Sequence, residues 1–367
     1  MASETVCIQV RCFIPTMGLY KGMLMKKKMR DNISSPIQLP ESMKKVEPSV
    51  GSEDNKAMMI ICQAGIDPSK HNSYIGRLPS INGDARPPPE KSFQPKEMST
   101  MIYRLLTALN VPKEVLNEYK KNCKARVDEI GHTFVRGVAD PTDSLLPGYC
   151  FLTGVKNKNT LGDELFVTRS PCIKKTDGKM LKVVTKKPEA MSDEDFEFLQ
   201  SLSFGTIIFA FPNDGMKAIP ELIANGDLDG DRYFVCWNKE ILEHIQAEPF
   251  VEEVSCEISK KEVKEEATIK TDCDKKLSVN RDWFQLAQER MADMSIIDLD
   301  ELIGKLYNAS EKAANNDKLG MESKDAQSFA DAYYQALDSA KHGNKIVLPV
   351  HLHKTLPEYL QKYICVS

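Results

Sequence analysis

The most informative segment of this chain reads Gly226-Asp-Leu-Asp-Gly-Asp231 and continues directly as Arg232-Tyr-Phe-Val-Cys-Trp237. Residues 205–211, which lie upstream, are rich in β-branched and aromatic side chains, so we expect the three aspartates on a tight loop between two strands. Carboxylates at i, i+2 and i+4 repel one another strongly unless a cation joins them. Because all the candidate ligands are oxygens, the pattern indicates a hard divalent ion, Mg²⁺ first and Mn²⁺ as the alternative.

Two other kinds of loop share part of this pattern. In a calcium-binding EF-hand, Asp227, Asp229 and Asp231 would be positions 1, 3 and 5, with a glycine at position 6 and a glutamate at position 12. Position 6 is Arg232 and position 12 is Asn238, and the flanks are strand-like, so the spacing argues against a calcium loop. The remaining alternative is an acidic hairpin tip, since Asp-Gly is common turn chemistry.

Length and composition are those of an ordinary globular protein. The 367 residues allow two or three domain-sized units, and the content is 41% hydrophobic and 28% charged. No apolar run reaches the roughly 18 residues that a membrane helix needs, and we find no secretory signal. The ten cysteines form no Cys-x-x-Cys pairs, so we expect reduced thiols in a cytoplasmic or nuclear protein, not a disulfide framework or a zinc site.

The net charge of −4 argues weakly against nucleic-acid binding, but the distribution of charge does not. Residues 21–30 carry five basic side chains and no acidic one, and residues 169–187 carry seven basic side chains against one acidic one. A local basic surface beside a metal site is enough to hold a phosphate backbone. The alternative for each run is a solvated strand face.

Local patterns also predict several helices. Ser99 can cap a helix with apolar residues at helical spacing, and a second helix follows Pro112. An acidic helix is expected near residues 192–202. Residues 281–342 are expected to be helical, because apolar side chains recur there at i, i+3 and i+4.

The aspartate segment and its surroundings resemble the catalytic half of the eukaryotic RNA-dependent RNA polymerases of RNA silencing. The loop with Tyr233-Phe-Val-Cys-Trp237 matches the hallmark of that family, and five further blocks follow the family's order. These blocks are Tyr20-Lys-Gly-Met-Leu24 ("KGV"), Ser42-Met-Lys-Lys45 ("SMKK"), Gly137-Val-Ala-Asp140 with Leu145-Leu-Pro-Gly-Tyr-Cys-Phe151 ("GCLDETGxLxxGQVF"), Val167-Thr-Arg-Ser-Pro-Cys172 ("VTRNPC") and Ala336-Leu-Asp-Ser-Ala-Lys-His-Gly343 ("VDYPKTG").

The resemblance implies an α+β fold with two double-psi β-barrels linked by helices and a C-terminal helical region. Only about twenty residues precede the "KGV" block, so the first barrel is expected to be incomplete and the chain N-terminally truncated relative to that family. The boundaries that we expect are 1–66 for the partial first barrel, 67–132 for a proline-rich crossover and helical linker, 133–240 for the second barrel with the aspartate loop, 241–280 for a charged flexible segment and 281–367 for the C-terminal helices.

The reaction implied is RNA-directed RNA synthesis from nucleoside triphosphates on a single-stranded RNA template, which supplies double-stranded RNA for small-RNA silencing. An all-carboxylate site leaves metal positions open to phosphate oxygens, as two-metal transfer requires. By resemblance, the metal ligands and catalytic carboxylates are Asp227, Asp229 and Asp231. The resemblance also gives Lys21 and Lys45 as catalytic cations and Arg169, Lys44 and Lys341 as substrate-binding residues.

Departures from the family pattern leave other functions open. The family's Arg-Pro before "SMKK" reads Pro40-Glu41 here, so one basic contact is lost. One alternative is a truncated, non-catalytic paralogue that binds RNA. The other is a fragment of a DNA-dependent RNA polymerase-like enzyme, whose metal loop also carries three aspartates. Partners other than RNA and nucleotides would be silencing-pathway proteins or the missing N-terminal region, and no membrane is expected.

Overall fold

The computed structural model describes residues 7–14, 18–25, 43–46, 58–62, 74–77, 98–121, 131–154, 161–202, 205–247, 250, 296–342 and 346–367. The chain divides into two compact units. The first comprises Met1–Cys172 and Thr176–Glu253, and the second comprises Ile173–Lys175 and Val254–Ser367. Each unit has its own core, and the aspartate loop belongs to the first.

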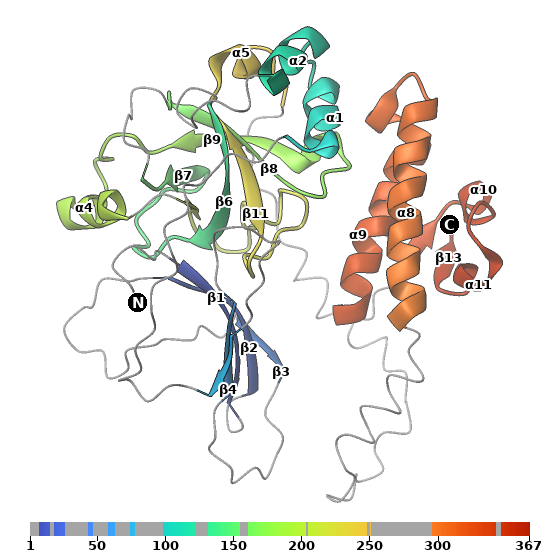
Figure 1. Ribbon diagram of the computed structural model, residues 1–367, viewed down its shortest axis with the longest axis horizontal. Coiled ribbons are helices and arrows are strands. Elements are labelled where there is room, and N and C mark those ends of the chain that lie inside the picture. The colour runs from blue at the N-terminus through green and yellow to red at the C-terminus, as the bar shows by residue number, and fades with distance from the viewer. Residues whose placement is uncertain are drawn as a thin grey trace, which may run out of the picture. The chain divides into compact units, whose positions relative to one another are not determined.

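Six strands of the first unit close into a barrel in the order β10-β6-β11-β8-β9-β7 (Figure 1). These strands are β6 (His132–Ala139), β7 (Tyr149–Leu152), β8 (Glu164–Arg169), β9 (Gly178–Val183), β10 (Thr206–Phe209) and β11 (Arg232–Cys236). The pairs β10–β6 and β7–β9 are parallel, and the other four pairs are antiparallel. The protein is therefore of the mixed α+β class, with a closed barrel that carries the aspartate loop.

The loop is not a hairpin tip. Strand β10 pairs with β6 and β7, whereas β11 pairs with β6 and β8, so β6 lies between the two strands that flank the loop. The expectation that the aspartates lie on a loop between two strands is confirmed, because residues 210–231 connect β10 to β11 across the end of β6. Strand β10 runs parallel and β11 antiparallel to β6, so the connection reverses the chain but does not join paired strands. Turn chemistry is local, whereas the choice of strand partners depends on residues far apart in the sequence.

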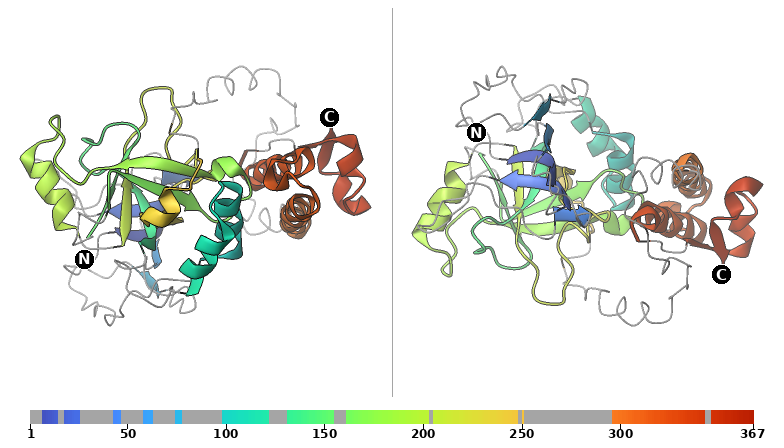
Figure 2. Two further views of the ribbon diagram at one scale, coloured as in Figure 1. Left: turned by 90° about the horizontal axis from the view of Figure 1, so that it is seen from above. Right: turned by 90° about the horizontal axis from the view of Figure 1, so that it is seen from below.

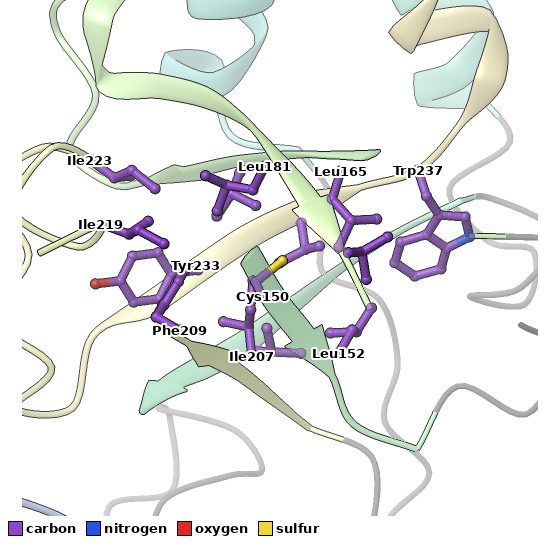
Figure 3. Close-up of a cluster of buried hydrophobic side chains, with 14 of the residues drawn as sticks. Cys150, Leu152, Leu165, Leu181, Ile207, Phe209, Ile219, Ile223, Tyr233 and Trp237 are labelled. Atoms are coloured by element: carbon purple, nitrogen blue, oxygen red, sulfur yellow. The ribbon is translucent and has the colours of Figure 1, made fainter. Parts of the chain in front are cut away.

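Strand β11 is buried on both faces, which explains its continuous apolar sequence. Tyr233, Val235 and the following Trp237 point into the barrel and belong to its core, while Phe234 and Cys236 point outward against helices. Figure 3 shows Tyr233 and Trp237 at opposite ends of this core. The alternation follows from the two-residue period of a strand. The loop is thereby attached to a strand that two separate cores hold in place.

The helices that cover the outer face are α1 (Thr100–Ala108), α2 (Lys113–Lys121) and α5 (Lys239–Leu242). The Ser99 hydroxyl accepts a hydrogen bond from the Ile102 amide at 3.3 Å, so the predicted cap of α1 is confirmed. Helix α4 (Asp193–Ser201) is likewise capped by Ser192. Figures 1 and 2 show α1 and α2 side by side and α4 on the other side of the barrel, where it packs on a separate cluster of apolar side chains.

The N-terminal strands of the same unit form an antiparallel five-stranded sheet in the order β3-β2-β1-β4-β5. Its strands are β1 (Cys7–Ile14), β2 (Gly18–Met25), β3 (Lys44–Val46), β4 (Met58–Cys62) and β5 (Tyr74–Arg77). Strand β5 falls within residues 67–132, where the sequence predicted a proline-rich crossover and helices without a strand. A four-residue strand surrounded by prolines gives almost no periodic signal, and it is defined here by its pairing with β4.

The second unit contains the predicted C-terminal helices. Helices α8 (Ile296–Asn316) and α9 (Lys324–His342) are joined through the 3₁₀ turn η4 (Gly320–Glu322). Short helices α10 (Val350–His353) and α11 (Glu358–Gln361) accompany a two-stranded parallel sheet of β12 (Ile346–Leu348) and β13 (Ile364–Val366), which the sequence did not suggest. Residues 251–280 of the predicted flexible segment lie outside the described residues. Across the part of the chain that the structure describes, no helix is both long and apolar enough to span a bilayer.

Thiol reactivity should report on this packing. Burial raises the pKa of Cys172 and of Cys236 to about 12, and it raises that of Cys150 further, whereas Cys365 is exposed. At pH 8 a rise from about 9 to about 12 lowers the thiolate fraction roughly 10³-fold. We expect native alkylation, resolved by mass spectrometry, to modify Cys365 and to spare the other three until denaturant is added. Rapid native labelling of Cys236 would contradict the closed barrel wall.

Candidate metal centre

The aspartate loop has a backbone conformation that explains part of its sequence. Ala224, Asn225 and Leu228 have φ values of 51°, 52° and 55°, and Gly230 has φ 128°. The last value is strongly disfavoured for side-chain-bearing residues, so a glycine at position 230 allows the loop to turn. Leu228 accepts a left-handed conformation, and its side chain packs against the barrel core. These turns direct the neighbouring carboxylates away from the core.

The three carboxylates converge. Ligand oxygens of Asp227, Asp229 and Asp231 all lie within 4.8 Å of one another, with Asp227 exposed and the other two half-buried. The Asp227 amide donates to Asp231 Oδ2 at 3.2 Å, and the Asp229 amide donates to Asp227 Oδ1 at 3.4 Å. Several carboxylate oxygens facing one small volume suit a hard divalent cation such as Mg²⁺ or Mn²⁺. The residues present therefore fit the ion that the sequence indicates.

Two basic side chains contact the triad. Lys21, on β2 of the N-terminal sheet, forms an ion pair with Asp229. Arg169, at the end of β8, places Nε 2.8 Å from Asp231 Oδ2, and its Nη1 donates to the Ala224 carbonyl at 2.7 Å. Burial alone would lower the pKa of the Arg169 guanidinium, but the Asp231 carboxylate outweighs it and the pKa is raised. The guanidinium therefore stays charged beside the loop.

The structure brings some of the predicted site residues together. The triad, Lys21 and Arg169 meet at one end of the barrel, although the assignment of Arg169 to substrate phosphate stays a prediction. Lys44 pairs with Tyr20 in the sheet, so alternation places it on the opposite face from Lys21. The side chains of Lys45 and Lys341 lie outside the described residues.

Tyr233 is a supporting residue that the sequence reading did not assign. It is completely buried under the loop, and its hydroxyl has no hydrogen-bond partner within the described ranges. A Cβ added at Gly226 would lie 2.4 Å from the Tyr233 hydroxyl, and one added at Gly137 would lie 2.4 Å from its ring. Burial first, and Asp231 second, raise the pKa of Tyr233 well above its usual range. The signal was available, because Tyr233 begins the inward-facing positions of β11.

Asp140, which also lies in a family-like block, has a structural role. Its buried carboxylate accepts hydrogen bonds from the Thr142 amide and hydroxyl at 2.9 and 2.7 Å, and from the amides of Ser144 and Leu145 at 2.8 Å each. Four donors satisfy this carboxylate and fix the turn between β6 and β7. The Asp140 carboxylate therefore stabilises the connection between β6 and β7.

Comparison with known proteins agrees with the motifs. The family model described as RNA-dependent RNA polymerase matches residues 89–364, which is most of the chain. The chain belongs to the RNA-dependent RNA polymerase family. The resemblance inferred from the six sequence blocks is therefore confirmed, and the matched range contains the whole barrel and the aspartate loop.

Several plant relatives show the extent of the similarity. The chain is 26% identical over 247 residues to "Probable RNA-dependent RNA polymerase 4" of Oryza sativa subsp. japonica, covering 66% of this chain and 19% of that protein. It is 28% identical over 241 residues to "Probable RNA-dependent RNA polymerase 3" of Arabidopsis thaliana, covering 62% and 22%. The chain thus spans about a fifth of the length of these curated relatives. Among solved structures, "RNA dependent RNA polymerase QDE-1 from Thielavia terrestris" has a TM-score of 0.40 at 17% identity, covering 70% of this chain and 28% of that one.

The packing under the loop generates a test by substitution. Gly226→Ala should destabilise the protein by about 1–3 kcal/mol, because its Cβ would overlap the Tyr233 hydroxyl. Adding Tyr233→Phe should recover part of this loss, since the phenyl ring lacks the overlapping oxygen. The recovery should be incomplete because the Pro220 carbonyl lies 2.9 Å from the same Cβ. Tyr233→Phe alone should be neutral or slightly stabilising, as it removes a buried unpaired hydroxyl. Urea unfolding of the four proteins measures all three effects, and strict additivity would contradict the proposed contact.

Proposed function

We propose that this chain carries the metal-binding catalytic centre of an RNA-directed RNA polymerase, which makes complementary RNA on a single-stranded template. The observation that carries the proposal is the convergence of Asp227, Asp229 and Asp231 within 4.8 Å at one end of a closed barrel. We further propose that this barrel is the second of two double-psi β-barrels and that the five-stranded sheet belongs to the first. The product would serve double-stranded RNA and small-RNA formation in gene silencing, in the cytoplasm or nucleus.

The triad would hold two divalent ions, which in such centres lower the pKa of the attacking hydroxyl and stabilise the leaving oxygens. The chain's own residues orient the three carboxylates and strengthen their attraction for a cation. The β11 attachment fixes the direction of the carboxylates, and Gly230 allows the loop to turn so that they face the same volume. Half-burial of Asp229 and Asp231 lowers the local dielectric, which strengthens their attraction for a cation. Asp227 remains open on the solvent side.

Lys21 supports the assignment to phosphate chemistry. The ion pair with Asp229 places its ammonium group directly at the proposed metal site. A cation there can neutralise a triphosphate or the growing strand as negative charge accumulates. We propose Lys45 as its companion, and Lys44 and Lys341 as contacts to RNA or nucleotide, on the strength of the sequence resemblance.

Removing one carboxylate tests the assignment. Asp229→Ala should reduce nucleotide incorporation on an RNA template by about 10³-fold or more, because it removes a charged ligand without touching the core. Asp214→Ala is the matched control, since Asp214 is exposed on the same β10–β11 connection outside the triad. Circular dichroism should be unchanged for both variants. Undiminished incorporation by Asp229→Ala would refute the proposal, and faster synthesis on DNA templates would favour the DNA-dependent alternative.

Lys21 permits a separate test of contact with phosphate. Lys21→Ala should weaken RNA binding irrespective of sequence and reduce the slope of log affinity against log salt by about one unit or less. Lys186→Ala, which removes an exposed cation within the second basic run, is the control and should act more weakly. Filter binding across a salt series gives both quantities. Identical slopes for wild type and Lys21→Ala would return Lys21 to the role of a surface ion pair.

A further inference from the structure

Arg169 contacts both ends of the segment 224–231, which contains the aspartate loop. Its Nε lies 2.8 Å from the Asp231 carboxylate, and its Nη1 donates to the Ala224 carbonyl at 2.7 Å. Ala224 begins the left-handed turn before the triad, and Asp231 is the last ligand before β11. The guanidinium therefore links Ala224 to Asp231, and the segment between these two residues contains the other two ligands, Asp227 and Asp229.

The anchor of this bridge is rigid. Arg169 is the last residue of β8 and pairs directly with Tyr233 of β11, two residues beyond Asp231. The strands on both sides are buried, so the position of the Arg169 backbone is fixed by the barrel wall. The side chain is itself only 19% exposed, and it lies beside Gly226, where an added Cβ would be in ordinary contact with Arg169 Cδ at 3.4 Å. The position from which Arg169 reaches Asp231 and Ala224 is therefore set by strands β8 and β11 of the barrel.

The chemistry of the bridge requires arginine. A guanidinium is planar and presents several donors in a fixed fork, so one group can hold a carboxylate with one nitrogen and a carbonyl with another. A lysine ammonium is a single charge on a flexible stem. Lysine would keep the charge near Asp231 but would not hold both partners in one geometry.

We propose that Arg169 is a positioning residue that closes the metal-binding loop and raises its affinity for a divalent cation, acting through Asp231 and the Ala224 carbonyl. The inference rests on the proposed function for the identity of the site, but it concerns how the loop is held. It assigns to Arg169 a role distinct from the contact with substrate phosphate that the sequence resemblance implies.

The sign of the effect on metal affinity separates the possibilities. If Arg169 were only a neighbouring positive charge, removing it would raise the affinity for Mn²⁺, because a repulsive charge beside Asp231 would be lost. If it positions the loop, the charge-retaining Arg169→Lys must lower that affinity, by about tenfold according to the usual effect of residues that orient metal ligands. Arg169→Lys is the informative variant, since it changes geometry while conserving charge.

The experiment measures Mn²⁺ binding to the full chain by electron paramagnetic resonance, without RNA or nucleotide, for wild type, Arg169→Lys, Arg169→Ala and the exposed control Lys186→Ala. We expect about tenfold weaker binding for Arg169→Lys, wild-type binding for Lys186→Ala, and faster hydrogen exchange at the Gly226 amide, which donates to the Pro220 carbonyl at 2.8 Å. RNA affinity in EDTA should change by less than twofold. Hydrogen exchange at barrel amides in the same data set shows whether each variant is folded.

Unchanged or tighter Mn²⁺ binding by Arg169→Lys would overturn the inference, and so would a loss of RNA affinity in EDTA with normal Mn²⁺ binding, which would make Arg169 a phosphate contact. Asp229→Ala separates failure of this inference from failure of the proposed function. If wild type binds Mn²⁺ no better than Asp229→Ala, the metal site itself is refuted, whatever Arg169 does.

Discussion

The structure around the loop is organised by the mutual repulsion of three carboxylates held within 4.8 Å of one another. Each close pair costs on the order of a few kcal/mol before screening by solvent. A free loop would relieve this repulsion by spreading the side chains apart. Here the backbone prevents it, because Leu228 is packed into the core and the chain after Asp231 enters a buried strand. Lys21 and Arg169 offset part of the repulsion through their ion pairs with Asp229 and Asp231.

The barrel supplies the stiffness that this arrangement requires. Inward side chains of β11 are fixed by the barrel core, and its outward side chains are fixed by α1, α2 and α5. Tyr233 links that strand to the loop, because its ring occupies the space beside Gly137 and its hydroxyl occupies the space beside Gly226. Rigid elements place functional groups more reproducibly than loops do. Here the aspartate loop is held in place by β11, the barrel strand that follows it.

The triad and its suitability as a set of oxygen ligands for a divalent ion could be predicted from the sequence, because those properties are local. The Ser99 and Ser192 caps were predictable for the same reason. The proximity of Lys21 to Asp229 followed only from resemblance, since no spacing rule connects residues two hundred positions apart. The position of β6 between β10 and β11 could not be predicted, because strand pairing depends on residues far apart in the sequence. Strand β5 was missed, and the contact of Tyr233 with Gly226 depends on three-dimensional packing that periodicity does not report.

The strand order of the barrel also governs when the site can exist. Strand β6 is the first barrel strand in the chain, yet its partners β10 and β11 come last, with His132 pairing to Cys236. At about 5–20 residues per second of protein synthesis, roughly 5–20 s separate the emergence of β6 from that of β11. Until β10 emerges β6 has neither neighbour, and until β11 emerges it lacks the partner that joins it to β8, so the earlier strands can form only a partial wall. The aspartate loop, Gly226–Asp231, is synthesised immediately before β11, the strand that closes the barrel. Its three carboxylates can therefore be held close together only after β11 has emerged and paired with β6 and β8.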